Sequence, residues 1–494
     1  MDSIASFLLQ EWEANPYHII LESLFLVFLA YLIPQKVYFQ KLTMRNLMRE
    51  KLTSKEVEAL CKEWVPEPLC PVAEANKVAD SPVDGPLISA VLPGKVVLAD
   101  GSERVDMATS NFLALGGDKQ ILDACESTIR KYGVGTCGPR GFYGTVDVHL
   151  ALEKRLKEFF RMDSAILYSY DFATIASVIP AFAKRGDHIV LDKGLSMAVQ
   201  VGCELSRSHL TFFEHNDVNS LIAALTAVNK SISKKHQASV RKYIVIEGLY
   251  ANSGDIAPLK RIVELGREYK FRVIMDDSFG IGTLGKTGRG TAEHWGMECN
   301  EVDMITAGLG NATASVGGFC IGSEIVCDHQ RLSGSGYCFS ASLPTFLATA
   351  SIQALDRIDS DPAMVQKLQD LASFAHEQLR LYSDVLTVRG SAPSALIHVD
   401  VNFLTQPALR LSPTRVDAVL QQIVDQVSAQ DKALLSVWRF SVTSDAPARS
   451  TISDEEWTPS IKLCINIKLD KNVIKRVIKT LAEKAKAAQD SSKY

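Results

Sequence analysis

The stretch with the most familiar chemistry is residues 280–287, whose sequence GIGTLGKT fits the GxxxxGK[ST] pattern of a phosphate-binding loop. In such a loop, backbone amides and a lysine hold nucleotide phosphates, which requires a strand directly before the loop and a helix that starts at the lysine. Here Gly288, Arg289 and Gly290 follow, and two glycines make a poor helix start. The sequence therefore argues against nucleotide binding at this loop.

The same stretch belongs to a longer pattern. Residues 273–294 (VIMDDSFGIGTLGKTGRGTAEH) resemble the DEAHSxGxxGxxGRGxxEH signature of the α-oxoamine synthases, pyridoxal-phosphate (PLP) enzymes that condense an amino acid with an acyl-CoA. Residues 132–153, 247–259, 317–319 and 339–344 resemble further segments of this family, in the same order and spacing. The resemblance runs from about residue 100 to the C-terminus. It implies the α/β fold of fold-type-I PLP transferases, with a large, mostly parallel sheet domain and a smaller C-terminal α+β domain.

By this resemblance, the chain departs from the family at its cofactor contacts. The lysine that binds PLP lies six residues before a Gly-Gly pair, here Gly317 and Gly318, and that position is Asn311. An amide cannot form the imine that a lysine forms with an aldehyde. Three further contacts are substituted. Ser196 replaces the histidine that stacks on the cofactor ring, Phe279 replaces the histidine of DEAH, and Asp171 replaces the glycine of the phosphate turn. One contact is kept, because Asp276 has the position of the aspartate that pairs with the pyridine nitrogen. A carboxylate at a phosphate-binding helix start repels the phosphate. The chain alone is therefore expected to bind no PLP and to be inactive.

A member of this family without the lysine implies a related catalytic subunit that carries it. Fold-type-I enzymes build each active site at the dimer interface, so this chain can still supply loops that close its partner's site. The candidates for that contribution are Cys137, Arg140, Tyr143, Ser340 and Ser342. The resemblance further implies that PLP is bound covalently by the partner, in a heterodimer or a dimer of heterodimers. An amino acid and an acyl-CoA would be the substrates, and a small activating subunit and ORM-type regulators would be further partners.

Two of these candidates have ordinary alternatives. Cys137 is equally consistent with a small buried thiol that only fills space. Arg140 is either a surface arginine or, in its glycine-rich loop, an anion clamp for CoA phosphates or a carboxylate.

Two rival functions remain open. An active homodimeric synthase, of the 5-aminolevulinate or amino-oxononanoate type, requires the lysine that this sequence lacks at residue 311. A pseudoenzyme that acts only as a membrane scaffold or regulator needs no site at all. The discriminating observation is whether a partner's activity depends on Cys137, Arg140 and Ser340, or only on the N-terminal segment.

That N-terminal segment, residues 17–33 (YHIILESLFLVFLAYLI), is apolar and is followed by Pro34. About 20 helical residues span a bilayer core, so the pattern predicts a transmembrane helix, with a buried helix or a signal peptide as the alternatives. Acidic residues precede the segment and basic residues follow it. The positive-inside rule then predicts a single pass with a lumenal N-terminus and a cytosolic body, and the resemblance implies the endoplasmic reticulum membrane.

Composition and charge bound the remaining possibilities. The chain has 494 residues, 47% of them hydrophobic, and a formal net charge of -4, which excludes a globally basic nucleic-acid-binding protein. Its ten cysteines form no CxxC pair and its histidines no HExxH, so we expect no metal site. We expect four parts: a membrane anchor and basic juxtamembrane helix (1–50), an arm (51–99), the large PLP-fold domain (100–350) and the small domain (351–494). Strands that alternate with amphipathic helices after residue 100 predict a buried parallel sheet.

Overall fold

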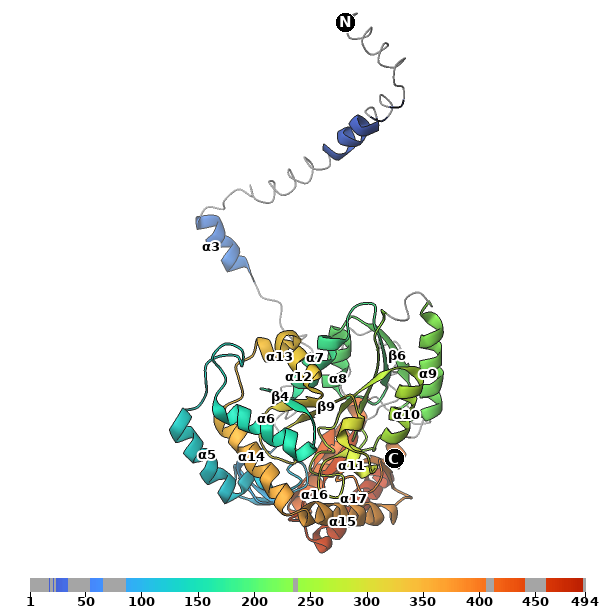
Figure 1. Ribbon diagram of the computed structural model, residues 1–494. Coiled ribbons are helices and arrows are strands. Elements are labelled where there is room, and N and C mark those ends of the chain that lie inside the picture. Colours follow the sequence, from blue (N-terminus) through green and yellow to red (C-terminus); the bar gives the residue numbers. More distant parts are fainter. Residues whose placement is uncertain are drawn as a thin grey trace, which may run out of the picture. The chain divides into compact units, whose positions relative to one another are not determined.

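A computed structural model describes residues 17, 21, 24–33, 54–64, 86–233, 239–405, 413–439 and 459–491 (Figure 1). The chain divides into two units, residues 1–85 and residues 86–494. In the first unit, residues 24–33 are helical, and α3 spans Ser54–Glu63. None of the helices in the described ranges is both long and apolar enough to cross a bilayer. The predicted span at residues 17–33 falls partly outside those ranges, so the transmembrane helix stays a prediction.

The second unit is built on a seven-stranded sheet with the order β4-β10-β9-β8-β7-β5-β6. The strands are β4 (Ser164–Tyr168), β5 (His188–Asp192), β6 (His209–Phe213), β7 (Lys242–Glu247), β8 (Arg272–Asp276), β9 (Met304–Gly308) and β10 (Gly318–Gly322). Most of their residues are buried, since helices cover both faces of such a sheet, and only β6 at the edge is half-exposed. The alternation of strands and helices that the sequence predicts after residue 100 is confirmed in this sheet.

The sheet is mostly parallel, as predicted, with one exception. β5, β6, β7, β8 and β9 pair in parallel, whereas β10 runs antiparallel to both of its neighbours, β4 and β9. The parallel strands therefore end at one edge of the sheet. Residues that follow these strand ends are brought together there.

Helices pack around this sheet. Those that contact its strands include α6 (Asp147–Phe160), α7 (Asp171–Phe182), α9 (Val218–Ser231), α10 (Leu259–Tyr269) and α12 (Glu324–Ser333). A second group, α5 (Lys119–Tyr132) and α14 (Thr345–Ser360), packs together and against α6, as Figure 1 shows in teal and orange. The shorter helices are α8 (Met197–Leu205), α11 (Thr291–His294) and α13 (Ser335–Cys338). No helix begins at Lys286, where a phosphate-binding loop would need one; the next helix, α11, begins at Thr291.

Two smaller sheets complete the unit. The first has the order β1-β2-β3-β13, and its strands are β1 (Ile88–Leu92), β2 (Lys95–Leu98), β3 (Glu103–Asp106) and β13 (Ala433–Leu434). The second has the order β11-β12-β15-β14, and its strands are β11 (Leu386–Arg389), β12 (Leu396–Val401), β15 (Ser460–Cys464) and β14 (Ser436–Trp438). The C-terminal helices are α15 (Ala363–Arg380), α16 (Pro413–Asp431) and α17 (Lys471–Ser491). The predicted domain boundary at residue 350 falls within α14, and the division into a large and a small domain stays a prediction.

Candidate functional site

A pocket of about 520 Å³ lies at the carboxyl ends of β7 and β8. Its wall contains Asp171, Ser196, Asp276 and Phe279, the four positions besides residue 311 that the sequence identified as altered or retained cofactor contacts. This is where ligands bind in open α/β sheets, because the loops after parallel strands converge at that edge. Folding thus gathers the substituted positions at one place.

Each of these residues is positioned by the end of a strand or the start of a helix. Asp171 is the first residue of α7, directly after β4, and Ser196 is the N-cap of α8, which follows β5. Asp276 is the last residue of β8, and Phe279 stands in the turn after it. Phe279 packs edge to face on Phe112, with ring centroids 6.5 Å apart. An aromatic ring therefore occupies the position at which the family has a histidine.

Asn311 is bound into the structure behind the pocket wall. Its side chain is 8% exposed, and its amide nitrogen donates to the backbone carbonyl of Ser278 at 2.7 Å. Its amide oxygen accepts a hydrogen bond from the Ser110 hydroxyl, also at 2.7 Å. Ser278 lines the pocket, so Asn311 serves here as a structural tie to the pocket wall.

Three carboxylates give the pocket its electrostatic character. Burial, together with the charge of Asp276, raises the pKa of Asp171 to about 7 and also that of Glu247 to about 7. Burial raises the pKa of Asp276 as well, although hydrogen bonds from the Ser278 amide and the Thr306 hydroxyl oppose the shift. Three acidic groups that share one buried region thus resist simultaneous ionisation.

The residues present do not fit PLP. The described residues that line the pocket include no lysine, and residue 311 carries an amide. The start of α7, where the phosphate would meet backbone amides, carries the Asp171 carboxylate instead. A Cβ on Gly308 of β9 would lie closer than 3.0 Å to this carboxylate, which shows how closely Asp171 fills the space beside the strand. Of the four wall positions, Asp276 alone keeps the residue of the family pattern, and the absence of PLP from this chain stays a prediction.

The sequence motifs did not assign a role to three further wall residues, Glu247, Asn252 and Trp438. Glu247 is 2% exposed, and its two oxygens accept hydrogen bonds from the amides of Ser196 (2.7 Å) and Ala251 (2.8 Å). The indole nitrogen of Trp438 donates to the Asn252 side chain at 3.0 Å. Glu247 opens one of the family segments and was accessible to sequence reasoning, whereas Trp438 comes from β14 and only folding brings it here.

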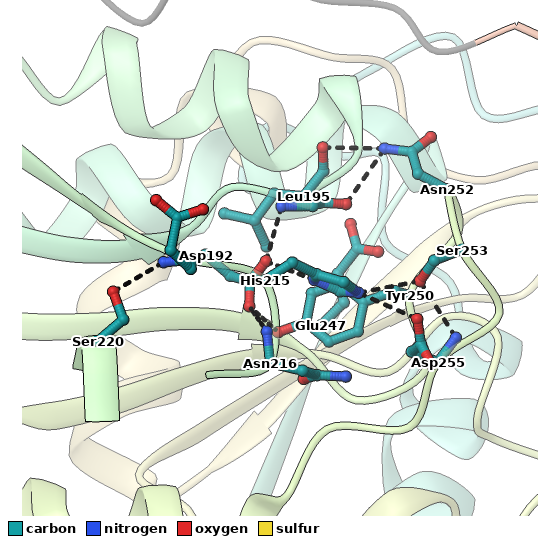
Figure 2. A network of polar contacts seen from close by, with 12 residues as sticks. Asp192, Leu195, His215, Asn216, Ser220, Glu247, Tyr250, Asn252, Ser253 and Asp255 are labelled. Carbon is teal, nitrogen blue, oxygen red and sulfur yellow. Dashed lines mark hydrogen bonds and ion pairs between the residues drawn. The ribbon is translucent and has the colours of Figure 1, made fainter. Parts of the chain in front are cut away.

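A polar network fixes the loops next to this pocket (Figure 2). His215 contacts Asp192 at the end of β5 (Nδ1 to Oδ1, 2.7 Å) and Asp255 (Nε2 to Oδ2, 3.2 Å). The hydroxyl of Tyr250 donates to the other oxygen of Asp192 at 3.1 Å. Burial lowers the pKa of His215, but the hydrogen bonds and charges of the two carboxylates outweigh it and raise that pKa to about 9. A charged imidazolium therefore holds the loops after β5, β6 and β7 together near neutral pH.

The candidate partner-facing residues lie in two segments that the structure brings together. The Ser342 amide donates to Gly138 O at 2.9 Å, and the Ser342 hydroxyl donates to Gly144 O at 2.6 Å. Thr136 and Ser342 also share a short hydroxyl contact. The buried Ser342 thereby pins the loop 137–145, and Ser340 lies half-buried beside it in sequence.

Arg140 is not a surface arginine. It is 7% exposed, and its guanidinium forms a bidentate pair with Glu153 of α6 (Nη1 to Oε1, 3.0 Å; Nη2 to Oε2, 3.1 Å). Its Nε donates to the Thr145 hydroxyl at 2.9 Å. These contacts engage three of the five N–H donors of the guanidinium, and Glu153 already balances its charge, so an anion would compete with that carboxylate. The clamp stays a prediction.

The tip of the loop, in contrast, faces outward. Cys137 is exposed and has φ 56°, so its thiol is not a small filler of the core. Tyr143 is fully exposed with φ 64°, an uncommon conformation for a bulky residue. Phe142 and Phe339 are also largely exposed. Large apolar side chains gathered on neighbouring exposed segments are typical of a protein interface.

Comparison with known proteins shows the relationship directly. Residues 102–409 match the family model described as aminotransferase class I and II. Long chain base biosynthesis protein 1b of Oryza sativa subsp. japonica is 43% identical over 86% of this chain and 86% of its own. Serine palmitoyltransferase 1 of Dictyostelium discoideum is 38% identical over 94% of this chain and 93% of its own.

A solved structure confirms the fold. The chain is similar to serine palmitoyltransferase of Sphingomonas wittichii with a TM-score of 0.71 and 23% identity, covering 85% of this chain and 97% of that one. The predicted fold-type-I architecture is therefore confirmed for the second unit.

Proposed function

Since the chain belongs to the aminotransferase class I and II family, in the group of long chain base biosynthesis protein 1 and serine palmitoyltransferase 1, we propose that it is the non-catalytic subunit of a serine palmitoyltransferase. The observation that carries the non-catalytic role is the pocket at the ends of β7 and β8. It has the place of a cofactor site and holds Asp171, Ser196 and Phe279 where that site needs other residues.

The proposed reaction condenses L-serine with palmitoyl-CoA to 3-oxosphinganine, with release of CoA and CO2, in the first step of sphingolipid synthesis. The partner is the catalytic long-chain-base subunit 2, whose lysine binds PLP covalently, and the assembly is a heterodimer or a dimer of heterodimers. PLP supplies an electron sink for the carbanion chemistry on serine. No step of that chemistry is assigned to the pocket of this chain.

The contribution of this chain is to complete its partner's active site with the loop 137–145. Two features support this role. Ser342 fixes the loop by hydrogen bonds at both of its ends, and the outward side chains of Cys137, Tyr143 and Phe142 remain exposed in this subunit. A fixed loop with an exposed apolar tip is suited to shaping a pocket on another protein.

We further propose that residues 17–33 anchor the complex in the endoplasmic reticulum membrane, with a lumenal N-terminus and a cytosolic body. The support is the apolar run with acidic residues before it and basic residues after it, together with the helical conformation of residues 24–33, whose large apolar side chains are exposed. A small activating subunit and ORM-type regulators are the expected further partners.

The test is to co-purify the full chain with the lysine-bearing subunit and assay 3-oxosphinganine formation. The variant Cys137→Trp adds bulk at the exposed loop tip, and Leu122→Trp, on the exposed face of α5, is the matched control. Both complexes should assemble with unchanged folding stability, since exposed substitutions usually stay within about 0.5 kcal/mol. Only Cys137→Trp should lower turnover or admit alanine or glycine in place of serine, because a hydroxyl is discriminated only by well-held polar partners.

The alternative, a scaffold that adds nothing to the active site, predicts another result. Cys137→Trp would then have wild-type kinetics with serine and alanine, while deletion of residues 1–34 would still release the complex from membranes. The wild-type chain without its partner should be inactive on either view. Activity of the chain alone would contradict both.

A further inference from the structure

The pocket that lost its cofactor contacts is still a well-formed cavity with a mixed wall. The apolar part of its wall includes Phe172, Ile175, Met197, Ala198, Phe279 and Trp438. The acidic part consists of Asp171, Glu247 and Asp276. Ligand sites in proteins commonly combine a cavity of this size, mostly apolar walls and a few convergent polar groups. Three aromatic residues and three carboxylates in one wall form a more specific combination than a general apolar pocket.

The charge of the wall is almost entirely negative. Arg439 is the one basic residue among the described lining residues, and its guanidinium is paired with Asp417 (Nε to Oδ1, 2.7 Å; Nη2 to Oδ2, 3.0 Å). An anion entering the cavity would meet three carboxylates, and the charge of Arg439 is already balanced by Asp417. A cation would meet both the carboxylates and the electron-rich faces of aromatic rings.

The three carboxylates differ in how far the protein satisfies them. Each oxygen of Glu247 accepts a backbone amide, and each oxygen of Asp276 accepts one hydrogen bond. Asp171 accepts one long hydrogen bond, from the Ser278 hydroxyl at 3.4 Å, within the part of the chain that the structure describes. Asp171 therefore has the largest unused acceptor capacity in the wall, and it stands next to Phe172.

We propose that this pocket binds an organic ammonium cation that carries an apolar chain, with Asp171 as its principal counter-ion and with the ring of Phe279 and the apolar wall around it. Carboxylate and aromatic faces together are the usual recognition elements for such cations. The assignment rests on the wall of this chain and needs no catalytic activity. Its connection with the proposed function is that 3-oxosphinganine is a long-chain amine of the same chemical class.

The probe for the test is hexyltrimethylammonium, measured by isothermal titration calorimetry on the full chain in complex with its catalytic partner. A quaternary ammonium has no N–H and cannot form an imine with PLP on the partner, so that covalent reaction does not contribute to the signal. 1-Hexanol supplies the same chain without charge, and hexanesulfonate supplies it with the opposite charge. The expected result is binding of the cation and of neither control.

Two variants locate the binding. Asp171→Asn removes the charge at constant shape and should weaken binding by about tenfold or more. Phe279→Leu removes the aromatic face and should weaken the cation by several-fold. Glu126→Gln, an exposed carboxylate on α5 that pairs with Arg130, is the matched control and should bind as the wild type does. Equal melting temperatures of the variants establish that the fold is retained.

The pH dependence provides an independent arm. The charged and titratable groups facing the cavity from the elements around it are Asp171 on α7, Glu247 on β7, Asp276 on β8 and the Arg439–Asp417 pair. Because the first two have pKa values raised to about 7 and carboxylates are ionised above their pKa, affinity for the cation should rise from pH 5.5 to pH 8.5. Asp171→Asn should flatten much of that rise.

Several outcomes would overturn the assignment: equal affinity for hexanol and the cation, unchanged affinity in Asp171→Asn, or competition of the cation by inorganic phosphate. Serine palmitoyltransferase activity is measured in the same preparation. If the complex is active but does not bind the cation, this inference alone is refuted. If the complex binds the cation but is inactive, the result counts against the proposed function.

Discussion

Gly144 offers the sharpest test of the loop that is proposed to face the partner. A Cβ at this position would lie closer than 3.0 Å to the carbonyl oxygens of Gly138 and Pro139, which are backbone atoms and cannot rotate away. Gly144→Ala must therefore push the backbone at residue 144 away from the backbone at residues 138 and 139. Its own carbonyl also accepts the Ser342 hydroxyl at 2.6 Å, and Gly138 accepts the Ser342 amide, so the displacement threatens both hydrogen bonds.

The magnitude follows from these two effects. Overpacking costs about 1–3 kcal/mol, and each of the two weakened hydrogen bonds adds about 0.5–1.5 kcal/mol, so we expect Gly144→Ala to lower the free energy of unfolding by about 2–6 kcal/mol. Gly141, three residues earlier, is the control, because a Cβ there would meet nothing within 4 Å. Gly141→Ala should stay within about 0.5 kcal/mol of the wild type.

The assay compares the two variants as full complexes with the catalytic subunit. Thermal melting reports stability, and 3-oxosphinganine formation reports the partner's active site. Gly144→Ala should melt at lower temperature and turn over more slowly than Gly141→Ala at a temperature where both remain folded. Equal melting and equal turnover of the two variants would refute the view that Gly144 holds the loop in a shape the partner needs.

Asn311→Lys should give no borohydride-trapped PLP adduct on the introduced lysine by mass spectrometry, because Asp171 still occupies the phosphate position; a trapped adduct would show that residue 311 was the sole defect. Glu153→Gln should cost about 3 kcal/mol of stability, since it leaves the buried Arg140 guanidinium without its counter-charge, while Arg140→Met combined with Glu153→Leu should cost less. If Glu153→Gln is at least as stable as the double variant, the unpaired Arg140 guanidinium does not destabilise the fold, and the reasoning is refuted. His215 has a folded-state pKa raised to about 9, above its usual 6.5, so its charge contributes stability that is complete below pH 6.5 and lost as pH rises through 9. The free energies of unfolding of the wild type and of His215→Gln should thus differ most, by about 3 kcal/mol, below pH 6.5 and should converge above pH 9. A difference that stays constant with pH would contradict this.

The sequence determined the central sheet and the residue types at the positions of the family's cofactor contacts. Runs such as 243–247 and 273–276 are continuously apolar up to an acidic last residue and rich in β-branched residues, which is the pattern of a strand buried on both faces. Asn311 and Asp171 were recognised as substitutions because the family pattern fixes the spacing of the cofactor contacts along the chain. Whether a side chain can form an imine or attract a phosphate depends on its residue type, which the sequence gives directly.

The tertiary structure decided which side chains complete each other. Arg140 looked available for an anion because a loop sequence does not reveal its partner; the packing of that loop on α6 pairs it with Glu153. Trp438 reaches the pocket from β14, a strand of three residues with too little sequence for any periodicity to show. Local patterns report the conformation of a segment, whereas ion pairs and pocket walls depend on how distant segments pack. The position of Cys137 at the surface was undecided for the same reason, because a glycine-rich loop carries no periodicity that distinguishes an inward from an outward side chain.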